Sequence, residues 1–242
     1  MIFMNIPSLY ELFQERWGKF QTGWMISDTH FGDEDLRAGM PNRPSDEEIV
    51  KSINSKVGKN DLLIHMGDVG NIEYVRQLKG YKVLIMGNHD AGASNYKRQY
   101  AYKDYNQAWT LERAIADMRE RYPGWKITYL QLSTGWIRCT ADNCLFDEVY
   151  EGALMIGEKL MLSHEPVEIP WLFNIHGHNH QGNVKTSNHL NVCADVVGYE
   201  PVSLNKFLKE GHLSKIQTIH RACIDNAIER KKKRGGKKIR QK

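Results

Sequence analysis

The chain has 242 residues, of which 41% are hydrophobic and 26% charged, and its formal net charge is +4. This is the composition of an ordinary globular protein, long enough for one large or two small domains. No apolar run approaches the roughly 18 residues of a membrane span, and the N-terminus has no signal-peptide pattern, so we expect a cytoplasmic protein without membrane segments.

Basic residues are concentrated at the C-terminus. Residues 230–242, "RKKKRGGKKIRQK", hold nine Lys/Arg and no acid, which leaves 24 basic against 29 acidic residues in 1–229. Dense like charge does not pack, so we predict a single domain over 1–229 followed by a disordered tail over 230–242. Two interpretations of the tail stay open: a solvated segment without a partner, or a nonspecific contact with nucleic-acid phosphates.

The first third of the chain alternates strands and helices. Apolar runs at 23–27, 61–66 and 81–86 predict buried strands. Between the first two, Ser45 and Glu48 form a capping-box pattern that opens a helix ending near Gly58. A short helical pattern over 72–80 separates the last two. Strands joined by helices favour a largely parallel sheet, which places the protein in the α/β class.

The rest of the chain has a different sequence pattern. Residues 94–122 have a helical pattern, so we predict a helical cap over 91–125. Its interleaved basic and aromatic residues either stack nucleobases or pack on the sheet. Short strand patterns then follow from residue 126 to 195 and predict a second sheet. Helices are expected near 203–209 and 216–229.

Chemically active side chains follow five of these predicted strands. The segments are "SDTH" at 27–30, "GD" at 67–68, "GNHD" at 87–90, "SH" at 163–164 and "HGHNH" at 176–180. Each alone has an ordinary explanation: Asp28 or Asp68 as a helix N-cap, Asn88 as a turn residue, His164 or His89 as a surface residue. Together they would meet at the carboxyl ends of the strands, where α/β sheets bind ligands. Oxygen and nitrogen donors without thiolate suit Mn²⁺, Fe or Zn²⁺.

In this order the five segments resemble the signature of the calcineurin-like metallophosphoesterases, over nearly all of residues 24–198. "NRP" at 42–44 and "NVCADVVGYEPVSL" at 191–204 are similar to a small bacterial and phage subgroup of predicted phosphoesterases. The resemblance implies a four-layer α/β/β/α sandwich. It also implies two divalent metal ions and hydrolysis of a phosphoester.

Position by position, the resemblance assigns ligands to two metals. One set is Asp28, His30, Asp68 and His180; the other is Asp68, Asn88, His164 and His178. Asp68 would bridge the two ions, which are expected to be Mn or Fe/Zn and to turn a shared water into hydroxide. His176 and His65 fall outside these positions and are expected to pack or support the site.

His89 resembles the family histidine that contacts phosphate and protonates the leaving oxygen, with Asp90 as the residue that orients it. Arg43 and Arg37 are the nearest candidates to bind phosphate oxygens, with surface ion pairs as the alternative. The chain lacks the "GDxxDRG" pattern of the phosphoprotein phosphatases, because Gly67-Asp68 is followed by Val69-Gly70-Asn71. That departure disfavours a protein phosphatase.

Several functional alternatives stay open. The basic tail and the aromatic stretch favour a phosphodiester substrate, and a nuclease on DNA or RNA or a phosphomonoesterase are the alternatives. A catalytically silent binding scaffold is the alternative from another class. The four cysteines, Cys139, Cys144, Cys193 and Cys223, contain no C-x-x-C pair, so core or loop thiols are favoured over a metal site. The oligomeric state is not predicted.

Overall fold

A computed structural model describes residues 9–90 and 96–239, without the side chains of 234–239. Its first sheet has five strands in the order β12-β1-β2-β3-β7. β1 (Gly23–Ile26), β2 (Leu62–His65), β3 (Tyr81–Ile85) and β7 (Glu148–Tyr150) run parallel, and β12 (Val202–Ser203) is antiparallel to β1. The predicted parallel sheet is therefore confirmed.

A second sheet packs on the first. Its order is β11-β10-β9-β8, from β8 (Leu154–Gly157), β9 (Leu160–Leu162), β10 (Phe173–His176) and β11 (His189–Asn191). The main hydrophobic cluster joins both sheets, for example Ile64 and Val83 of the first with Leu162 and Ile175 of the second. The carboxyl ends of the parallel strands are consequently held close together across two packed sheets.

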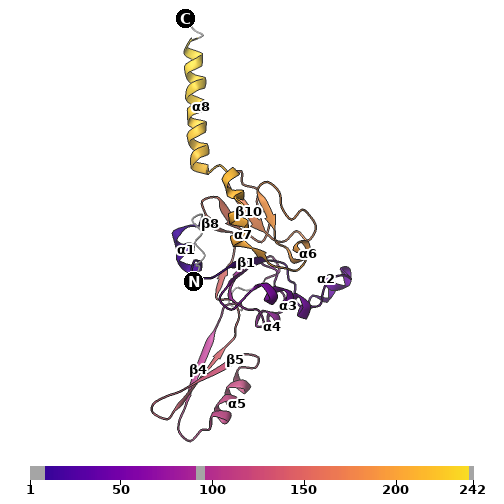
Figure 1. The fold of residues 1–242 in the computed structure, drawn as a ribbon, viewed down its shortest axis with the longest axis vertical. Helices are drawn as coiled ribbons and strands as arrows, with labels where there is room; N and C mark the ends of the chain where they lie inside the picture. The colour runs from indigo at the N-terminus through magenta and orange to yellow at the C-terminus, as the bar shows by residue number, and fades with distance from the viewer. Residues whose placement is uncertain (1–8, 91–95, 240–242) are drawn as a thin grey trace.

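Helices cover the outer face of the first sheet. α3 (Asp46–Lys56) begins with the predicted Ser45 and Glu48 capping box and buries Ile49 and Ile53 on Ile26 and Leu63. α1 (Glu11–Trp17), α2 (Glu34–Gly39), α4 (Ile72–Val75), α6 (Ala194–Val197), α7 (Leu204–Lys209) and the 3-10 helix η2 (His212–Lys215) complete the body (Figure 1). The mixed α/β class is confirmed, and the four-layer arrangement stays a prediction.

Residues 100–142 form a separate lobe that projects from the body (Figure 1). It consists of β4 (Tyr100–Tyr105), α5 (Leu111–Arg121), β5 (Lys126–Gln131) and β6 (Ile137–Asp142), with strand order β4-β6-β5. Within the described part of the predicted helical cap over 91–125, residues 111–121 are helical as expected, whereas residues 100–105 form a strand. Residues 91–95 lie outside the described part of the chain. The aromatic residues of Tyr100–Tyr105 favour a strand, and only Leu111–Arg121 keeps a helical apolar stripe.

The lobe is attached far from the carboxyl ends of the strands. Arg98, just before β4, forms an ion pair with Asp147, and Asp147 accepts the backbone N–H of Lys82 near the start of β3. Asn88, in contrast, follows the opposite end of β3. The lobe therefore extends from the amino end of the sheet and does not cap the groups at its carboxyl end.

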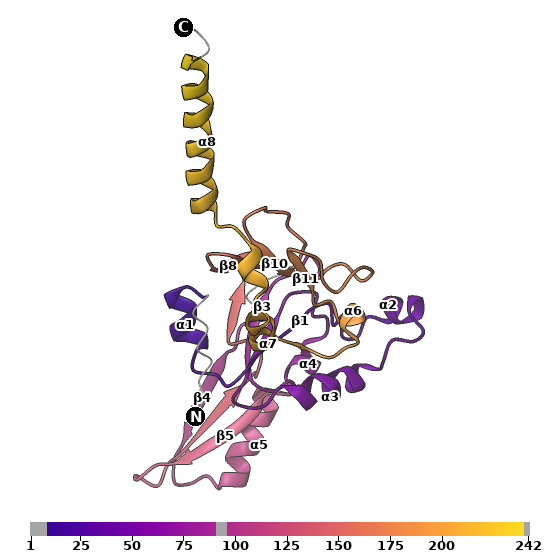
Figure 2. The ribbon, with the colours of Figure 1, turned by 45° about the horizontal axis from the view of Figure 1, so that its top comes forward.

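The last helix, α8 (Ile219–Ile239), extends away from the body (Figure 2). It includes residues 230–239, for which the sequence predicted disorder. Lys and Arg favour helix, and adding a residue to an existing helix is far easier than starting one, so the preceding turns extend into the basic segment. None of the described helices is long and apolar enough to cross a membrane.

Candidate metal centre

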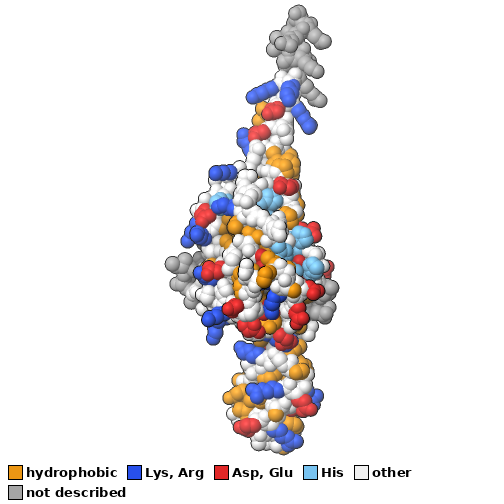
Figure 3. All heavy atoms as spheres, turned by 90° about the vertical axis from the view of Figure 1, so that its right-hand side faces the viewer, with side chains coloured by type: hydrophobic (Ala, Val, Ile, Leu, Met, Phe, Trp, Pro, Cys, Tyr) orange, Lys and Arg blue, Asp and Glu red, His pale blue; other side chains and the backbone are white. Residues whose placement is uncertain are grey.

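The structure brings together all seven predicted metal ligands. Asp28 and His30 follow β1, Asp68 follows β2 and Asn88 follows β3, whereas His164 follows β9 and His178 and His180 follow β10. Histidine side chains gather on one face of the body (Figure 3). Five strand ends from two sheets thus converge on one place, as parallel strands allow.

Backbone geometry at these loops is unusual. Asp28, His30, Asp68 and His178 have positive φ angles of 56°, 41°, 54° and 63°. Left-handed conformations of non-glycine residues cost roughly 1–3 kcal/mol each and concentrate at functional sites. Here they turn the chain sharply at the strand ends, so that side chains from neighbouring loops face one another.

Close packing against the loop after β1 explains why the "HGHNH" segment has a glycine at position 177. A Cβ at this position would lie 2.0 Å from the Ser27 side-chain oxygen and 2.4 Å from Oδ2 of Asp28. The close approach lets the backbone N–H of His178 donate to Oδ2 of Asp28 at 2.8 Å. This hydrogen bond fixes the β10 loop, with its two candidate ligands, against the β1 loop.

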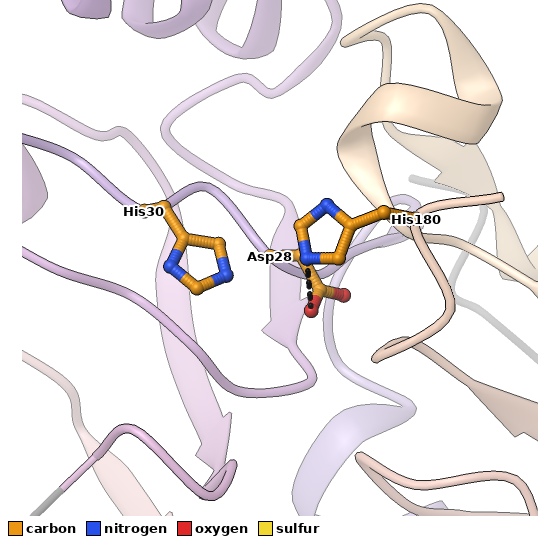
Figure 4. A group of neighbouring side chains, drawn as sticks. All are labelled: Asp28, His30 and His180. Atoms are coloured by element: carbon orange, nitrogen blue, oxygen red, sulfur yellow. Dashed lines mark ion pairs between the residues drawn. The ribbon is translucent and has the colours of Figure 1, made fainter. Parts of the chain in front are cut away.

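The first donor group is Asp28, His30 and His180, whose nearest ligand atoms all lie within 4.8 Å of one another (Figure 4). Nε2 of His180 is 3.6 Å from Oδ1 of Asp28. Asp28 is fully buried, yet its Oδ1 has no hydrogen-bond partner among the described residues, and neither does Nε2 of His30. Buried polar atoms without partners are costly, and a cation would satisfy them.

The second group is Asp68, His164 and His178, joined by Asn88. Nε2 of His164 lies 2.9 Å from Oδ1 of Asn88, 3.1 Å from Nδ1 of His178 and 3.3 Å from Oδ2 of Asp68. Nδ1 of His164 faces the Met66 carbonyl at 2.8 Å, a contact that requires its proton. Nε2 thus faces an amide oxygen, an imidazole nitrogen and a carboxylate, and such a cluster of acceptors attracts a cation.

Asp68 lies between the two groups. Its Oδ2 is 3.6 Å from Nε2 of His30 in the first group and 3.3 Å from Nε2 of His164 in the second. Burial alone would raise the pKa of the Asp68 carboxyl, but hydrogen bonds from His164 and from the His89 backbone N–H lower it to about 2. An ionised carboxylate in contact with both donor groups is suited to bridging two cations.

The donor set fits divalent metal ions. The partnerless atoms of Asp28 and His30 and the facing acceptors of the second group are carboxylate, imidazole and amide atoms. Such mixed oxygen and nitrogen sets suit Mn²⁺, Fe or Zn²⁺. Cys193 lies near His180 and Asp195, but burial raises the pKa of its thiol, so it stays protonated and is a poor ligand.

Asp195 was missed by the sequence analysis. Its Oδ2 lies 2.6 Å from Nδ1 of His180, which leaves Nε2 of that ring free to face Asp28. Burial raises the pKa of Asp195, but hydrogen bonds from His180 and Tyr199 and the charge of Arg43 lower it to about 2. A carboxylate that orients a ligand histidine in this way is typical of metal sites.

Arg43 has a different place from the one predicted. Its guanidinium is buried, pairs with Asp195 and donates to the backbone carbonyls of Asp28 and Thr29. These contacts argue against the predicted binding of phosphate by Arg43, because its guanidinium already stabilises the loop after β1 and the carboxylate behind His180. The two segments that marked the subgroup, around Arg43 and Asp195, meet in this contact.

Replacing Asp195 by asparagine should weaken metal binding by about 10–100-fold, because His180 would lose the charged acceptor that orients its ring. Titration of the metal-free protein with Mn²⁺ measures this affinity. Asp225→Asn removes a carboxylate from the exposed part of α8 and is the matched control. Equal affinities of Asp195→Asn and wild type would show that Asp195 does not support the site.

Asp90 also differs from its predicted role. Its carboxylate accepts the backbone N–H groups of Asp68, Val69 and Gly87 and the hydroxyl of Tyr96. It therefore fixes the loops after β2 and β3 to each other, and it forms no hydrogen bond or ion pair with the His89 ring among the described residues. The aspartate of the "GNHD" segment is thus explained by its hydrogen bonds to the backbone of these two loops.

His89 is exposed beside the donor groups. Its backbone N–H donates to Oδ1 of Asp68 at 2.9 Å, and its ring centre is 5.5 Å from that of His30. Arg37 instead pairs with Asp46 at 2.7 Å and ties α2 to the start of α3. Of the predicted groups that are not metal ligands, only His89 has a side chain left free by these contacts to meet a substrate.

The remaining histidines of the predicted segments have packing roles. His176 is buried, its Nδ1 lies 2.8 Å from the Gly177 carbonyl, and its ring packs edge-on against His189. His65 is also buried and contacts the Thr29 hydroxyl at 2.9 Å, and burial lowers its pKa to about 4. Both agree with the supporting roles predicted for them.

The chain was compared with known proteins and family models. No curated protein matched the chain. A solved structure of a protein of unknown function from Aquifex aeolicus is similar, with 22% identity, a TM-score of 0.49 and coverage of 78% of this chain and 98% of that one. The family model for calcineurin-like phosphoesterases matches residues 24–223, which include all seven candidate ligands. The chain therefore belongs to the calcineurin-like phosphoesterase family.

Proposed function

We propose that the chain is a dinuclear metal-dependent phosphodiesterase. Family membership indicates metal-dependent hydrolysis of a phosphoester. The observation that carries the dinuclear assignment is the position of Asp68, whose Oδ2 lies near one histidine from each donor group. The first ion would be held by Asp28, His30, Asp68 and His180, and the second by Asp68, Asn88, His164 and His178.

When bound, two divalent ions neutralise the phosphoryl oxygens and supply a nucleophile from water near neutral pH. The protein's own residues orient the ligand histidines and supply a proton. Asp195 holds the proton of His180 on Nδ1, and the Met66 carbonyl holds that of His164 on Nδ1, so each ring directs Nε2 to the centre. His89, exposed and fixed through its backbone to Asp68, donates a proton to the leaving oxygen.

The charges around the centre support a diester. A phosphomonoester carries up to two negative charges on its phosphate, whereas a diester carries one. Arg43 and Arg37, the two cations predicted to bind phosphate, are engaged with Asp195 and Asp46. Because both guanidinium groups are paired with carboxylates, a monoanionic phosphate is the better fit to this site.

Paired ester assays test this proposal. Protein loaded with Mn²⁺ should hydrolyse bis-p-nitrophenyl phosphate with a higher kcat/KM than p-nitrophenyl phosphate, and chelation should abolish both activities. A preference for the monoester would contradict the diesterase assignment. Metal binding without turnover of either ester would favour the scaffold alternative, against which the presence of all seven donors and His89 argues.

We propose a separate role for the basic end of α8, which is nonspecific binding of polyanions. Deleting residues 230–242 removes nine cations and should weaken binding to single-stranded DNA by at least about tenfold at low salt. Hydrolysis of bis-p-nitrophenyl phosphate should not change, because α8 extends away from the body (Figure 2). Fluorescence anisotropy with labelled DNA measures the binding, and equal affinities of the two proteins would contradict the role.

A further inference from the structure

A pocket of about 340 Å³ opens beside the second donor group. Asn88 and His164 belong both to its wall and to that group. The rest of the wall comes from the end of β3, the loop between β7 and β8, and the segment after β9: Met86, Gly87, Glu151, Gly152, Ala153, Ser163, Glu165 and Val167. A phosphate held at the donor groups would therefore have one of its ester arms next to this space.

The pocket wall has a clear charge. Its described residues include two carboxylates, Glu151 and Glu165, and no lysine or arginine. Both glutamates are exposed, and neither side chain forms an ion pair or hydrogen bond within the described part of the chain. No described lysine or arginine therefore neutralises their negative charge, which acts on whatever enters the pocket.

The pocket is also lined by small residues on one side. Gly152 and Ala153 are exposed in the loop between β7 and β8, and a Cβ added at Gly152 would meet no atom within 4 Å. Met86 and Val167 supply apolar surface. Such a space accepts a ring or a short chain, with acceptors at its edge for hydroxyl or amino groups.

We infer that this pocket binds one ester arm of the substrate and selects an arm without negative charge. The inference rests on the proposed phosphodiesterase function and narrows its substrate class to small diesters whose single phosphate is the one hydrolysed. A polynucleotide would bring a neighbouring phosphate towards Glu151 and Glu165, and like charges repel. The geometry thus disfavours the nuclease alternative, which becomes an outcome of the test.

Two symmetrical diesters test the charge selection. Bis(4-nitrophenyl) phosphate and bis(4-carboxyphenyl) phosphate have arms of nearly equal shape, and symmetry ensures that the same arm enters the pocket in either orientation. Glu151→Lys should raise the kcat/KM of the carboxylated ester relative to the nitro ester by about tenfold, because one repulsion becomes an attraction. Glu151→Gln should give a smaller increase.

The control is Glu158→Lys, which makes the same charge change at an exposed position outside the pocket. A ratio that is equal in wild type, Glu151→Lys and Glu158→Lys would overturn the charge selection. Efficient cleavage of single-stranded DNA by wild type would also overturn it. If wild type hydrolyses neither ester, the proposed function fails and this inference fails with it. That outcome differs from an unchanged ratio, which would overturn the charge selection alone.

A steric variant tests the pocket independently of charge. Gly152 does not have a positive φ angle and has open space around it, so Gly152→Leu should fold normally and partly fill the pocket. It should lower kcat/KM for bis-p-nitrophenyl phosphate and spare methyl p-nitrophenyl phosphate, whose methyl arm needs little room. Equal losses on both esters would place the shared p-nitrophenyl leaving arm in the pocket, and unchanged rates on both would show that the pocket does not hold an ester arm.

Discussion

Asp68→Asn should reduce hydrolysis of bis-p-nitrophenyl phosphate by about 10³-fold, because metal charge stabilisation contributes several kcal/mol and each 1.36 kcal/mol is a factor of ten. Asparagine keeps the shape and can still accept the His89 backbone N–H at Oδ1. It removes the negative charge that lies between His30 and His164. Steady-state kinetics and elemental analysis of the same preparation measure activity and metal content.

The control is Asp35→Asn, which removes an exposed carboxylate from α2. It should retain wild-type activity and metal content. Full metal content and activity in Asp68→Asn would contradict the bridging role. Loss of one ion with partial activity would show that Asp68 serves only one of the two donor groups.

His89→Ala should lower kcat by about 10²–10⁴-fold, the usual contribution of general acid–base catalysis, and should leave the metal content unchanged. The loss should be larger for diphenyl phosphate than for bis-p-nitrophenyl phosphate, because the more basic phenolate needs protonation more. Kinetics with both esters measure the difference. This dependence on the leaving group separates proton donation from a merely structural role.

His220→Ala provides the control, since His220 is an exposed histidine near the start of α8. It should match wild type with both esters. An equal loss of activity on both esters in His89→Ala would assign His89 to phosphate contact rather than to proton donation. No loss on either ester would remove His89 from the mechanism.

The sequence predicted those features that depend on local pattern. Apolar runs located β1, β2 and β3, and the Ser45 and Glu48 capping box located the start of α3. Short polar segments after the strands located the donor residues, because the carboxyl ends of parallel strands meet at one edge. These signals lie within a few residues of each other in the chain, so they can be recognised without the fold.

Features that depend on distant contacts could not be predicted in this way. Asp195 is 15 positions from His180, and Arg43 is 152 positions from Asp195, so neither contact has a local signature. Arg43 looked like a phosphate ligand only because its buried partner was unknown. Asp90 similarly acts on the backbone of the loop after β2, 21 to 22 positions away.

In the lobe and in α8, prediction of secondary structure from the sequence failed for a different reason. In 100–142 a short helix lies among strands whose aromatic and polar residues alternate imperfectly, and a helical pattern near the start was extended too far. In α8 a composition typical of disorder continues a helix begun by the preceding turns. Composition and period describe a segment alone, whereas these outcomes depend on what each segment is joined to.

The central claim is that seven side chains hold two metal ions bridged by Asp68. A crystal of the protein grown with Mn²⁺ tests it most directly, through anomalous scattering at the manganese edge. The account predicts two peaks about 3.5–4 Å apart, one on each side of the Asp68 carboxylate. A single peak, or peaks away from Asp28, Asp68 and His164, would contradict it.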